Sequence, residues 1–194
     1  MRLDQPRIEP ITDAELDDDT RDLFSTMGQN GRVLNIFRTL AWHPKLLKRW
    51  LVFGNHVLGK STLPAREREL IILRAGYVCA SGYEWAQHVA IGRREGLSDA
   101  EIERIADGPN ADGWSTDDSI LLAATDELVS DKFISGPTWE ALQARWNRQQ
   151  LMDIVFAVGQ YTLVSMALNT FGVQIDDGVD RFPPALFAGD RFPS

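Results

Sequence analysis

The fold is decided by the stretch from Glu67 to Ile102, which reads ERELIILRAGYVCASGYEWAQHVAIGRREGLSDAEI. A helix is expected over Ala65–Val78, because the apolar run Leu70–Leu73 follows charged residues and is typical of a helix buried on most sides. Ser81-Gly82 interrupts this helix. A second helix is expected over Tyr83–Glu95, so the stretch predicts two helices joined by a short break.

Helical spacing of apolar residues continues on both sides of this stretch, and no segment alternates as a strand would. Pro44, Pro64 and Pro137 mark helix starts, since proline fits the first helical turn. Ser98 and Glu101 form a capping-box pattern that opens another helix. We therefore expect an all-α protein, with further helices near residues 12–27 (capped by Thr12 or Asp13), 43–59, 98–108, 116–130, 137–146 and 151–170.

The length of 194 residues and the apolar fraction of 44% suit one buried core. No linker or low-complexity tract divides the chain, so we expect a single domain over residues 1–194. The helical periodicity is lost from Phe171 onward, and an extended tail is expected over 171–194. Its hydrophobic anchors would be Phe182, Pro183, Pro184, Phe187, Phe192 and Pro193.

Several classes of protein are disfavoured by composition. The net charge of −8 argues against a nucleic-acid partner, which needs clustered Lys and Arg. The N-terminal residues lack the basic and apolar regions of a signal peptide. No apolar stretch is expected to reach the roughly 20 residues that span a bilayer. We therefore expect a cytoplasmic protein that binds neither nucleic acid nor membrane.

The residues with the clearest chemical potential are Glu84 and His88, which lie four apart and share one helix face. A carboxylate beside an imidazole orients the ring and raises its basicity, which suits a general acid or base. Glu67 or Glu69 would add a second carboxylate if the two helices pack antiparallel. The alternative is an ordinary Glu–His pair on a solvated helix face.

This region resembles the carboxymuconolactone decarboxylase / alkylhydroperoxidase D-like superfamily, through the Arg-Glu-Leu run, the short break, the histidine and the GLSDAEI tail. The resemblance is strongest over residues 36–106 and less specific over 116–170. Its dithiol branch has a Cys-x-x-Cys pair where this chain has Ser81 and Glu84, whereas the family glutamate and histidine match Glu69 and His88. The resemblance implies an alkylhydroperoxidase D-like helical bundle, assembled as a trimer or hexamer.

The first functional hypothesis is a carboxymuconolactone decarboxylase-like enzyme that performs acid/base chemistry on a small organic acid or lactone. His88 and Glu84 would carry protons, and Glu69 would orient or share the proton. Arg74 or Arg68 would hold a substrate carboxylate.

Two other hypotheses remain open. Cys79 is the single cysteine, so an antioxidant peroxidase would need to form a sulfenic acid that an external thiol resolves. Cys79 is otherwise a small buried apolar residue. The third hypothesis is a non-catalytic oligomeric member of the fold.

No cofactor or metal is expected. Glu84 and His88 would need His43 or His56 to complete a metal site, and the sequence offers no dedicated spacing for one. The partners expected are a small-molecule substrate and further copies of the same chain, because the long apolar helix near 151–168 exceeds what one small core needs.

Overall fold

The computed structural model describes residues 2–27 and 32–179. Every regular element in these ranges is a helix, which confirms the all-α prediction. The elements are α1 (Asp18–Met27), α2 (Asn35–Leu40), α3 (Pro44–Gly59), α4 (Ala65–Val78), α5 (Gly82–Arg94), α6 (Asp99–Arg104), the 3-10 turn η1 (Ile105–Asp107), α7 (Thr116–Asp131), α8 (Gly136–Arg145) and α9 (Arg148–Phe171).

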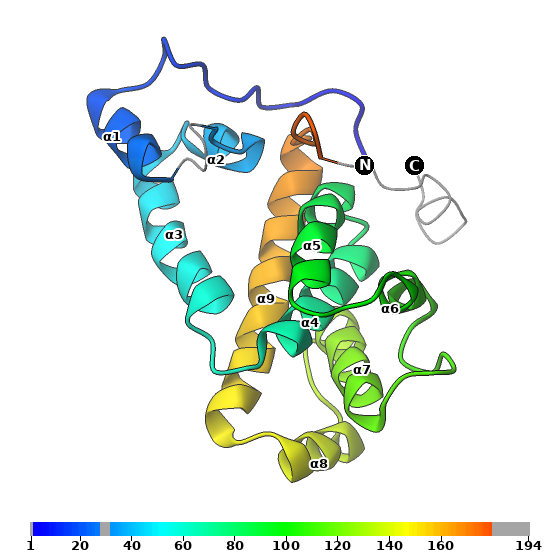
Figure 1. Cartoon of the computed structure of the whole chain (residues 1–194). Coiled ribbons are helices and arrows are strands. Elements are labelled where there is room, and N and C mark those ends of the chain that lie inside the picture. The colour runs from blue at the N-terminus through cyan, green and yellow to red at the C-terminus, as the bar shows by residue number, and fades with distance from the viewer. Residues whose placement is uncertain (1, 28–31, 180–194) are drawn as a thin grey trace.

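The helix α4 is the centre of the bundle and packs against α5, α7 and α9 (Figure 1). The four consecutive residues Leu70–Leu73 are completely buried, although they point to different sides of α4. Other helices therefore pack around most of the circumference of α4. The apolar run therefore explains why this helix is surrounded, as the sequence predicted.

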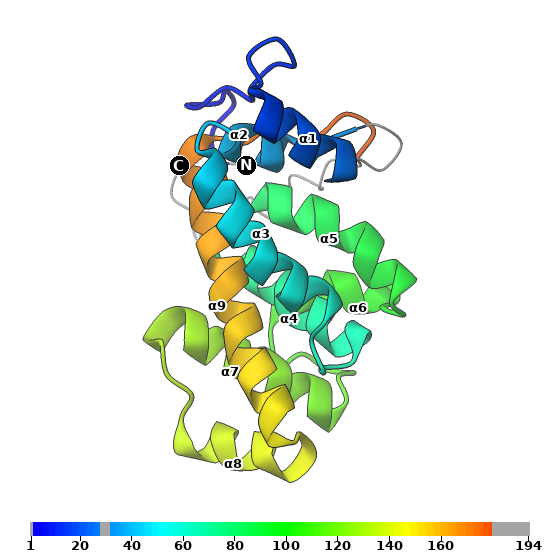
Figure 2. The ribbon, with the colours of Figure 1, turned by 90° about the vertical axis from the view of Figure 1, so that its left-hand side faces the viewer.

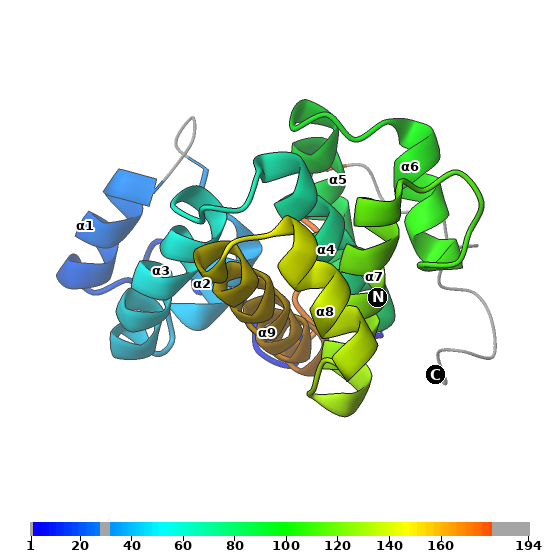
Figure 3. The same cartoon turned by 90° about the horizontal axis from the view of Figure 1, so that it is seen from below.

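A second group of elements lies beside α9, where α3 crosses it and carries α1 and α2 at one end (Figure 2). Seen from below, α9 lies between α3 on one side and α4 with α7 on the other (Figure 3). Buried side chains join α1 to α3, including Phe24 and Leu47. The helix α9 thus lies between the main core and the group formed by α1, α2 and α3.

The N-terminal helix begins later than predicted. Thr12 does not cap it, because the Thr12 hydroxyl and amide donate to Glu15 instead. The helix starts at Asp18, and the Asp17 carboxylate accepts a 2.7 Å hydrogen bond from the Thr20 amide. A short aspartate at this place satisfies a free amide of the first turn, so the cap is still of the expected chemical type.

The segment after α9 returns to the body of the protein. Val173 is 3% exposed and Asp176 is also 3% exposed, so these residues pack as part of the core. The proposed aromatic and proline anchors at 182–193 lie outside the described residues, and the predicted single-domain organisation stays a prediction.

The length of α9 contradicts one sequence expectation. Its 24 residues are long and apolar enough to cross a bilayer by length and hydropathy, although the sequence predicted no such stretch. Half of the most apolar 18-residue window is buried inside the protein, as in the core helix of many globular domains. The cytoplasmic location remains a prediction.

At the end of α9, Gly172 packs closely against the backbone of the N-terminal segment. Gly172 has a φ of +70° and its amide caps the helix at the Leu168 carbonyl. A Cβ at Gly172 would lie 2.8 Å from the carbonyl oxygen of Gln5. Gly178 has a similar φ of +77°, but no atom lies within 4 Å of its Cβ position.

We expect Gly172→Ala to destabilise the protein by about 1–3 kcal/mol more than Gly178→Ala. Both variants carry the left-handed strain, and only the first forces the N-terminal backbone away. Urea unfolding of both variants measures the difference. Equal losses of stability would contradict the close packing of the N-terminal segment on α9.

Candidate active site

The imidazole of His88 lies between two carboxylates. Its Nδ1 is 2.7 Å from Oε2 of Glu69 on α4, and its Nε2 is 2.9 Å from Oε1 of Glu84 on α5. The structure therefore brings together all three residues that the sequence singled out for acid/base chemistry. It also decides between the two upstream carboxylates, because Glu67 instead accepts a hydrogen bond from the indole of Trp146.

This cluster is buried. The exposed fractions are 0% for Glu69, 4% for Glu84 and 6% for His88, which rules out the solvated-face interpretation. Burial would lower the pKa of His88, but the charge of Glu84 and hydrogen bonds to both glutamates outweigh it and raise the pKa to about 9. His88 is therefore an imidazolium at neutral pH, rather than the neutral base that the sequence allowed.

The cluster also contains a guanidinium. Nε of Arg68 lies 3.4 Å from Oε1 of Glu69, and Arg68 is 9% exposed. Two cations and two carboxylates therefore balance, which is the arrangement that buried charges require. Arg68 faces Glu69, so it is already engaged and does not act as the free carboxylate-binding cation that was expected.

Close packing of α4 and α5 holds the cluster together. At Gly76, a Cβ would lie 3.4 Å from Cγ of Glu84, so the two helices approach to van der Waals contact at this position. The two helices are joined by a tight connection in which the Ser81 amide donates to the Gly76 carbonyl. The ring of Tyr161, from α9, contacts His88 edge-on with a centroid separation of 4.9 Å.

A cavity of about 160 Å³ opens onto Glu84 and His88. Its walls come from α2, α3, α5 and α9, and they are mainly apolar. The lining includes Phe37, Trp50, Glu84, His88, Gln160 and Tyr161. An apolar hollow with a few convergent polar groups is the usual form of a small-molecule site.

A second polar network beside the cavity was not predicted. The Tyr83 hydroxyl donates to Asp176 at 2.6 Å, and the Gln87 amide donates to the same carboxylate at 2.9 Å. The amide of Asn35 donates to its other oxygen. Burial and the Asp176 charge raise the pKa of Tyr83, so its hydroxyl stays protonated. This network fastens the segment after α9 against α2 and α5.

The other candidate residues lie elsewhere. Arg74 forms a two-point ion pair with Asp126 on α7, at 2.6 and 2.7 Å, and donates to the Ile105 carbonyl. It does not line the cavity, so its expected role in holding a substrate carboxylate has no support. Cys79 ends α4 and does not line the cavity either.

The Cys79 thiol is not activated. Burial raises its pKa, and the neighbouring hydroxyls of Thr162 and Ser165 only partly oppose this effect. A raised pKa leaves little thiolate at neutral pH, and the thiolate is the reactive form. Cys79 as a residue is nevertheless only partly buried, so it is not the fully buried apolar residue that was the alternative expectation.

The histidines that were considered as additional metal ligands do not join the cluster. His43 caps α3 by accepting the Leu46 amide, and His56 is exposed in the last turn of the same helix. Over residues 2–27 and 32–179, no group of three or more metal-binding side chains is placed to hold a metal ion.

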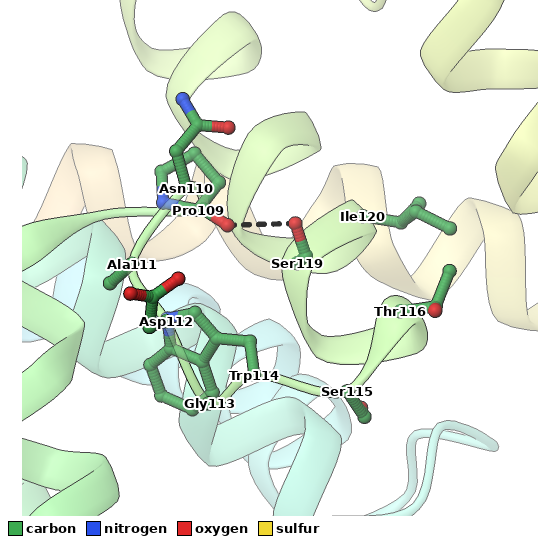
Figure 4. Close-up of a pocket in the computed structure, with 10 residues that line it drawn as sticks. All are labelled: Pro109, Asn110, Ala111, Asp112, Gly113, Trp114, Ser115, Thr116, Ser119 and Ile120. Atoms are coloured by element: carbon green, nitrogen blue, oxygen red, sulfur yellow. Dashed lines mark hydrogen bonds between the residues drawn. The ribbon is translucent and has the colours of Figure 1, made fainter.

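A larger hollow of about 420 Å³ lies along the loop and the start of α7, over residues 109–120 (Figure 4). Its hydrogen bonds serve the loop, since Ser119 donates to the Pro109 carbonyl and Trp114 to the Gly108 carbonyl. Its lining includes no buried charge cluster like that around His88, so the smaller cavity is the candidate active site.

Comparisons with known proteins agree with this fold. The profile of the Carboxymuconolactone decarboxylase family matches residues 44–126, which include the whole charge cluster. The alkylhydroperoxidase AhpD core protein of Ralstonia eutropha JMP134, described as peroxidase-related and uncharacterized, superposes with a TM-score of 0.77 at 21% identity, covering 97% of this chain and 98% of its own. Residues 44–126 therefore match the Carboxymuconolactone decarboxylase family, and the chain has the AhpD-like fold.

Further structural relatives show how widely this AhpD-like fold occurs. A peroxidase-related protein from Silicibacter sp. TM1040 has a TM-score of 0.75 at 19% identity, with 92% of this chain and 93% of that chain covered. A cysteine-to-alanine variant of the debrominase Bmp8, in complex with 2,3,4-tribromopyrrole, has a TM-score of 0.73 at 14% identity, with 93% and 95% covered. A comparison with curated proteins found no match.

The raised pKa of His88 predicts how stability depends on pH. The folded value of about 9 exceeds the ordinary 6.5, so protonation of His88 stabilises the fold fully below about pH 6.5, and this contribution is lost as pH rises through 9. The whole contribution is on the order of 3 kcal/mol. We expect the urea midpoint to fall between pH 7 and 9.5, and the fall to be much smaller in His88→Gln.

Nuclear magnetic resonance titration of the His88 ring provides the direct measurement. An imidazole that loses its proton near pH 6.5 in the folded protein would contradict the buried charge cluster.

Proposed function

We propose that this protein is an enzyme that moves a proton at carbon in a small, uncharged organic molecule such as a lactone. The observation that carries the proposal is the buried Glu69–His88–Glu84 cluster at the wall of an apolar cavity. Perturbed ionisable groups in a cavity are the usual mark of acid/base catalysis.

Glu84 is the proton acceptor in this proposal. It lines the cavity, and the imidazolium paired with its Oε1 orients the carboxylate. A C–H bond next to a carbonyl group breaks, its proton passes to Glu84, and the electron pair becomes an enolate. Glu84 then returns the proton to the same carbon, or to the γ-carbon where a conjugated double bond extends the enolate. Glu69 fixes the orientation of His88 from the opposite side of the ring.

The cavity favours an uncharged substrate. Its lining residues include no Lys or Arg, and the two arginines that the sequence suggested for binding a carboxylate, Arg68 and Arg74, are paired with Glu69 and Asp126. The imidazolium of His88 also lines the cavity, but it is already paired with Glu69 and Glu84, so a substrate carboxylate buried there would have no unpaired cation. Of the two substrate classes expected from sequence, the lactone is therefore preferred over the free organic acid.

We expect the wild-type protein to exchange carbon-bound protons of small lactones and cyclic ketones for deuterium in D₂O. Glu84→Gln keeps the size of the side chain but removes the base, so the exchange rate should fall about 10²- to 10⁴-fold. Proton nuclear magnetic resonance spectra of a panel of such compounds measure the rates. Glu140→Gln, which alters an exposed carboxylate on α8, is the matched control.

The exchange assay and a hydroperoxide-reduction assay together separate the other hypotheses. Cys79→Ser should leave the exchange rate unchanged, because Cys79 lies outside the cavity. Hydroperoxide reduction that disappears in Cys79→Ser would favour the peroxidase instead. Exchange that is equally fast in Glu84→Gln would disprove the proposed base, and an inert wild type across the panel would favour the non-catalytic alternative.

We also propose that a second copy of the chain covers the outer face of α9. Large apolar side chains are exposed along it, and the ring of Phe156 stacks edge-on against Phe53 of α3. After Asp153 this helix has no charged residue, so two such faces can meet without like-charge repulsion. The exposed residues of α9 are Met152, Val155, Phe156, Leu163 and Met166.

Light scattering on a sizing column tests this proposal. We expect the wild type to elute at a multiple of 21.8 kDa and Leu163→Lys to shift towards the monomer, because a buried lysine without a partner opposes association. Glu140→Lys on α8 is the control. A wild-type monomer at micromolar concentration would disprove the assembly, and binding to neutral lipid vesicles would assign the apolar face to a membrane.

A further inference from the structure

The hydroxyl of Tyr161 on α9 is a polar group that the protein leaves unpaired. The residue is 7% exposed and lines the cavity. Among the described residues, no hydrogen bond involves this hydroxyl, although a buried tyrosine hydroxyl ordinarily has a partner. Within the same part of the chain, the Oε1 atom of Gln160 is both unpaired and completely enclosed, whereas the Tyr161 hydroxyl is not among such enclosed atoms. The hydroxyl therefore keeps a surface that another molecule can touch.

The hydroxyl lies at the charge cluster around His88. The ring of Tyr161 packs against the His88 ring, with centroids 4.9 Å apart. Burial raises the pKa of the Tyr161 hydroxyl well above its ordinary value, and the charges of Glu84 and Glu69 raise it further. Because such charge effects weaken with distance, the hydroxyl is close to these carboxylates. Glu84 and His88 open onto the cavity, so the accessible surface of the hydroxyl faces the same space.

The state of the hydroxyl at neutral pH decides what it can bind. Its raised pKa keeps the proton in place, so Tyr161 is a neutral hydrogen-bond donor. Other donors beside the cavity are already used, since both ring nitrogens of His88 face carboxylates and the Tyr83 hydroxyl donates to Asp176. The lining includes no Lys or Arg. The group that Tyr161 suits is therefore a neutral acceptor such as a carbonyl oxygen.

We propose that Tyr161 is a catalytic residue that donates a hydrogen bond to the carbonyl oxygen of the substrate. This role rests on the proposed function, because it concerns the same substrate in the same cavity. When Glu84 removes the proton from the neighbouring carbon, the C–H electron pair forms the C=C bond of the enolate and the carbonyl π pair moves to oxygen. Tyr161 keeps its proton and stabilises the charge on that oxygen. When Glu84 returns the proton to carbon, the carbonyl is restored and Tyr161 is unchanged.

The variant that tests this role is Tyr161→Phe, which removes the hydroxyl and keeps the ring beside His88. The hydroxyl has no partner among the described residues, so we expect an unchanged or raised urea midpoint. For the lactone or cyclic ketone that the wild type exchanges fastest, kcat for deuterium exchange should fall about 10²- to 10³-fold, with a much smaller change in KM. Equal exchange rates in the wild type and Tyr161→Phe would overturn the proposal.

The matched control is Tyr77→Phe. Tyr77 lies on α4 and is also 7% exposed, but it does not line the cavity. Its exchange rate should equal that of the wild type. A loss of exchange in Tyr77→Phe as large as that in Tyr161→Phe would show that removing any buried tyrosine hydroxyl has this effect, and would also overturn the proposal.

A second measurement needs no turnover. Isotope-edited infrared spectra, with ¹²C and ¹³C at the carbonyl, give the C=O stretching frequency of bound cyclopentanone. A hydrogen bond lowers this frequency, so it should be lower in the wild type than in Tyr161→Phe. The dissociation constant should rise about threefold to tenfold in Tyr161→Phe. The same frequency in both proteins, or no binding of cyclopentanone to the wild type, would overturn the role of Tyr161.

The infrared measurement separates this role from the proposed reaction. Glu84→Gln should retain the low carbonyl frequency even where it no longer exchanges protons. A wild type that shows the low frequency and exchanges no protons would support the Tyr161 contact and disprove the proposed reaction alone. Loss of the low frequency in Glu84→Gln but not in Tyr161→Phe would overturn the role of Tyr161 as the donor.

Discussion

The interaction on which the rest of the structure depends is the pair of hydrogen bonds that hold the imidazolium of His88 between Glu69 and Glu84. Two carboxylates buried in an apolar bundle would repel each other, and either alone would carry a large desolvation cost. The cation between them, together with Arg68, removes this conflict. The pairing also joins α4 to α5, which approach closely where Gly76 lies beside the Glu84 side chain.

Much of this central pair of helices could be predicted from sequence, because its signals are local. The apolar run Leu70–Leu73 specifies a surrounded helix, and the four-residue spacing of Glu84 and His88 places their side chains on one face. Local spacing could not choose between Glu67 and Glu69, because that choice depends on how two helices pack. Local spacing also could not show that His88 is buried between two carboxylates, whose interactions raise its pKa and make it a cation at neutral pH.

The parts of the site that the sequence did not reveal come from distant segments. Asp176 accepts a hydrogen bond from Tyr83, which lies 93 positions earlier in the chain. Gln160 and Tyr161 belong to α9, where apolar residues are spread around the whole helix, so the sequence does not indicate which residues face inward. Arg74 illustrates the opposite error. Arg74 lies between Glu69 and Glu84 in the sequence, but its side chain pairs with Asp126 on α7 and does not line the cavity.

The helix α9 connects the chemistry of the site with the proposed assembly. Gln160 and Tyr161 face the cavity, whereas Leu163 and Met166 are exposed on another side of the same helix. The cavity wall from α3 contacts this exposed side through the rings of Phe53 and Phe156. A second copy packed there would restrain α3 against α9, and the separation of these two helices sets the width of the cavity.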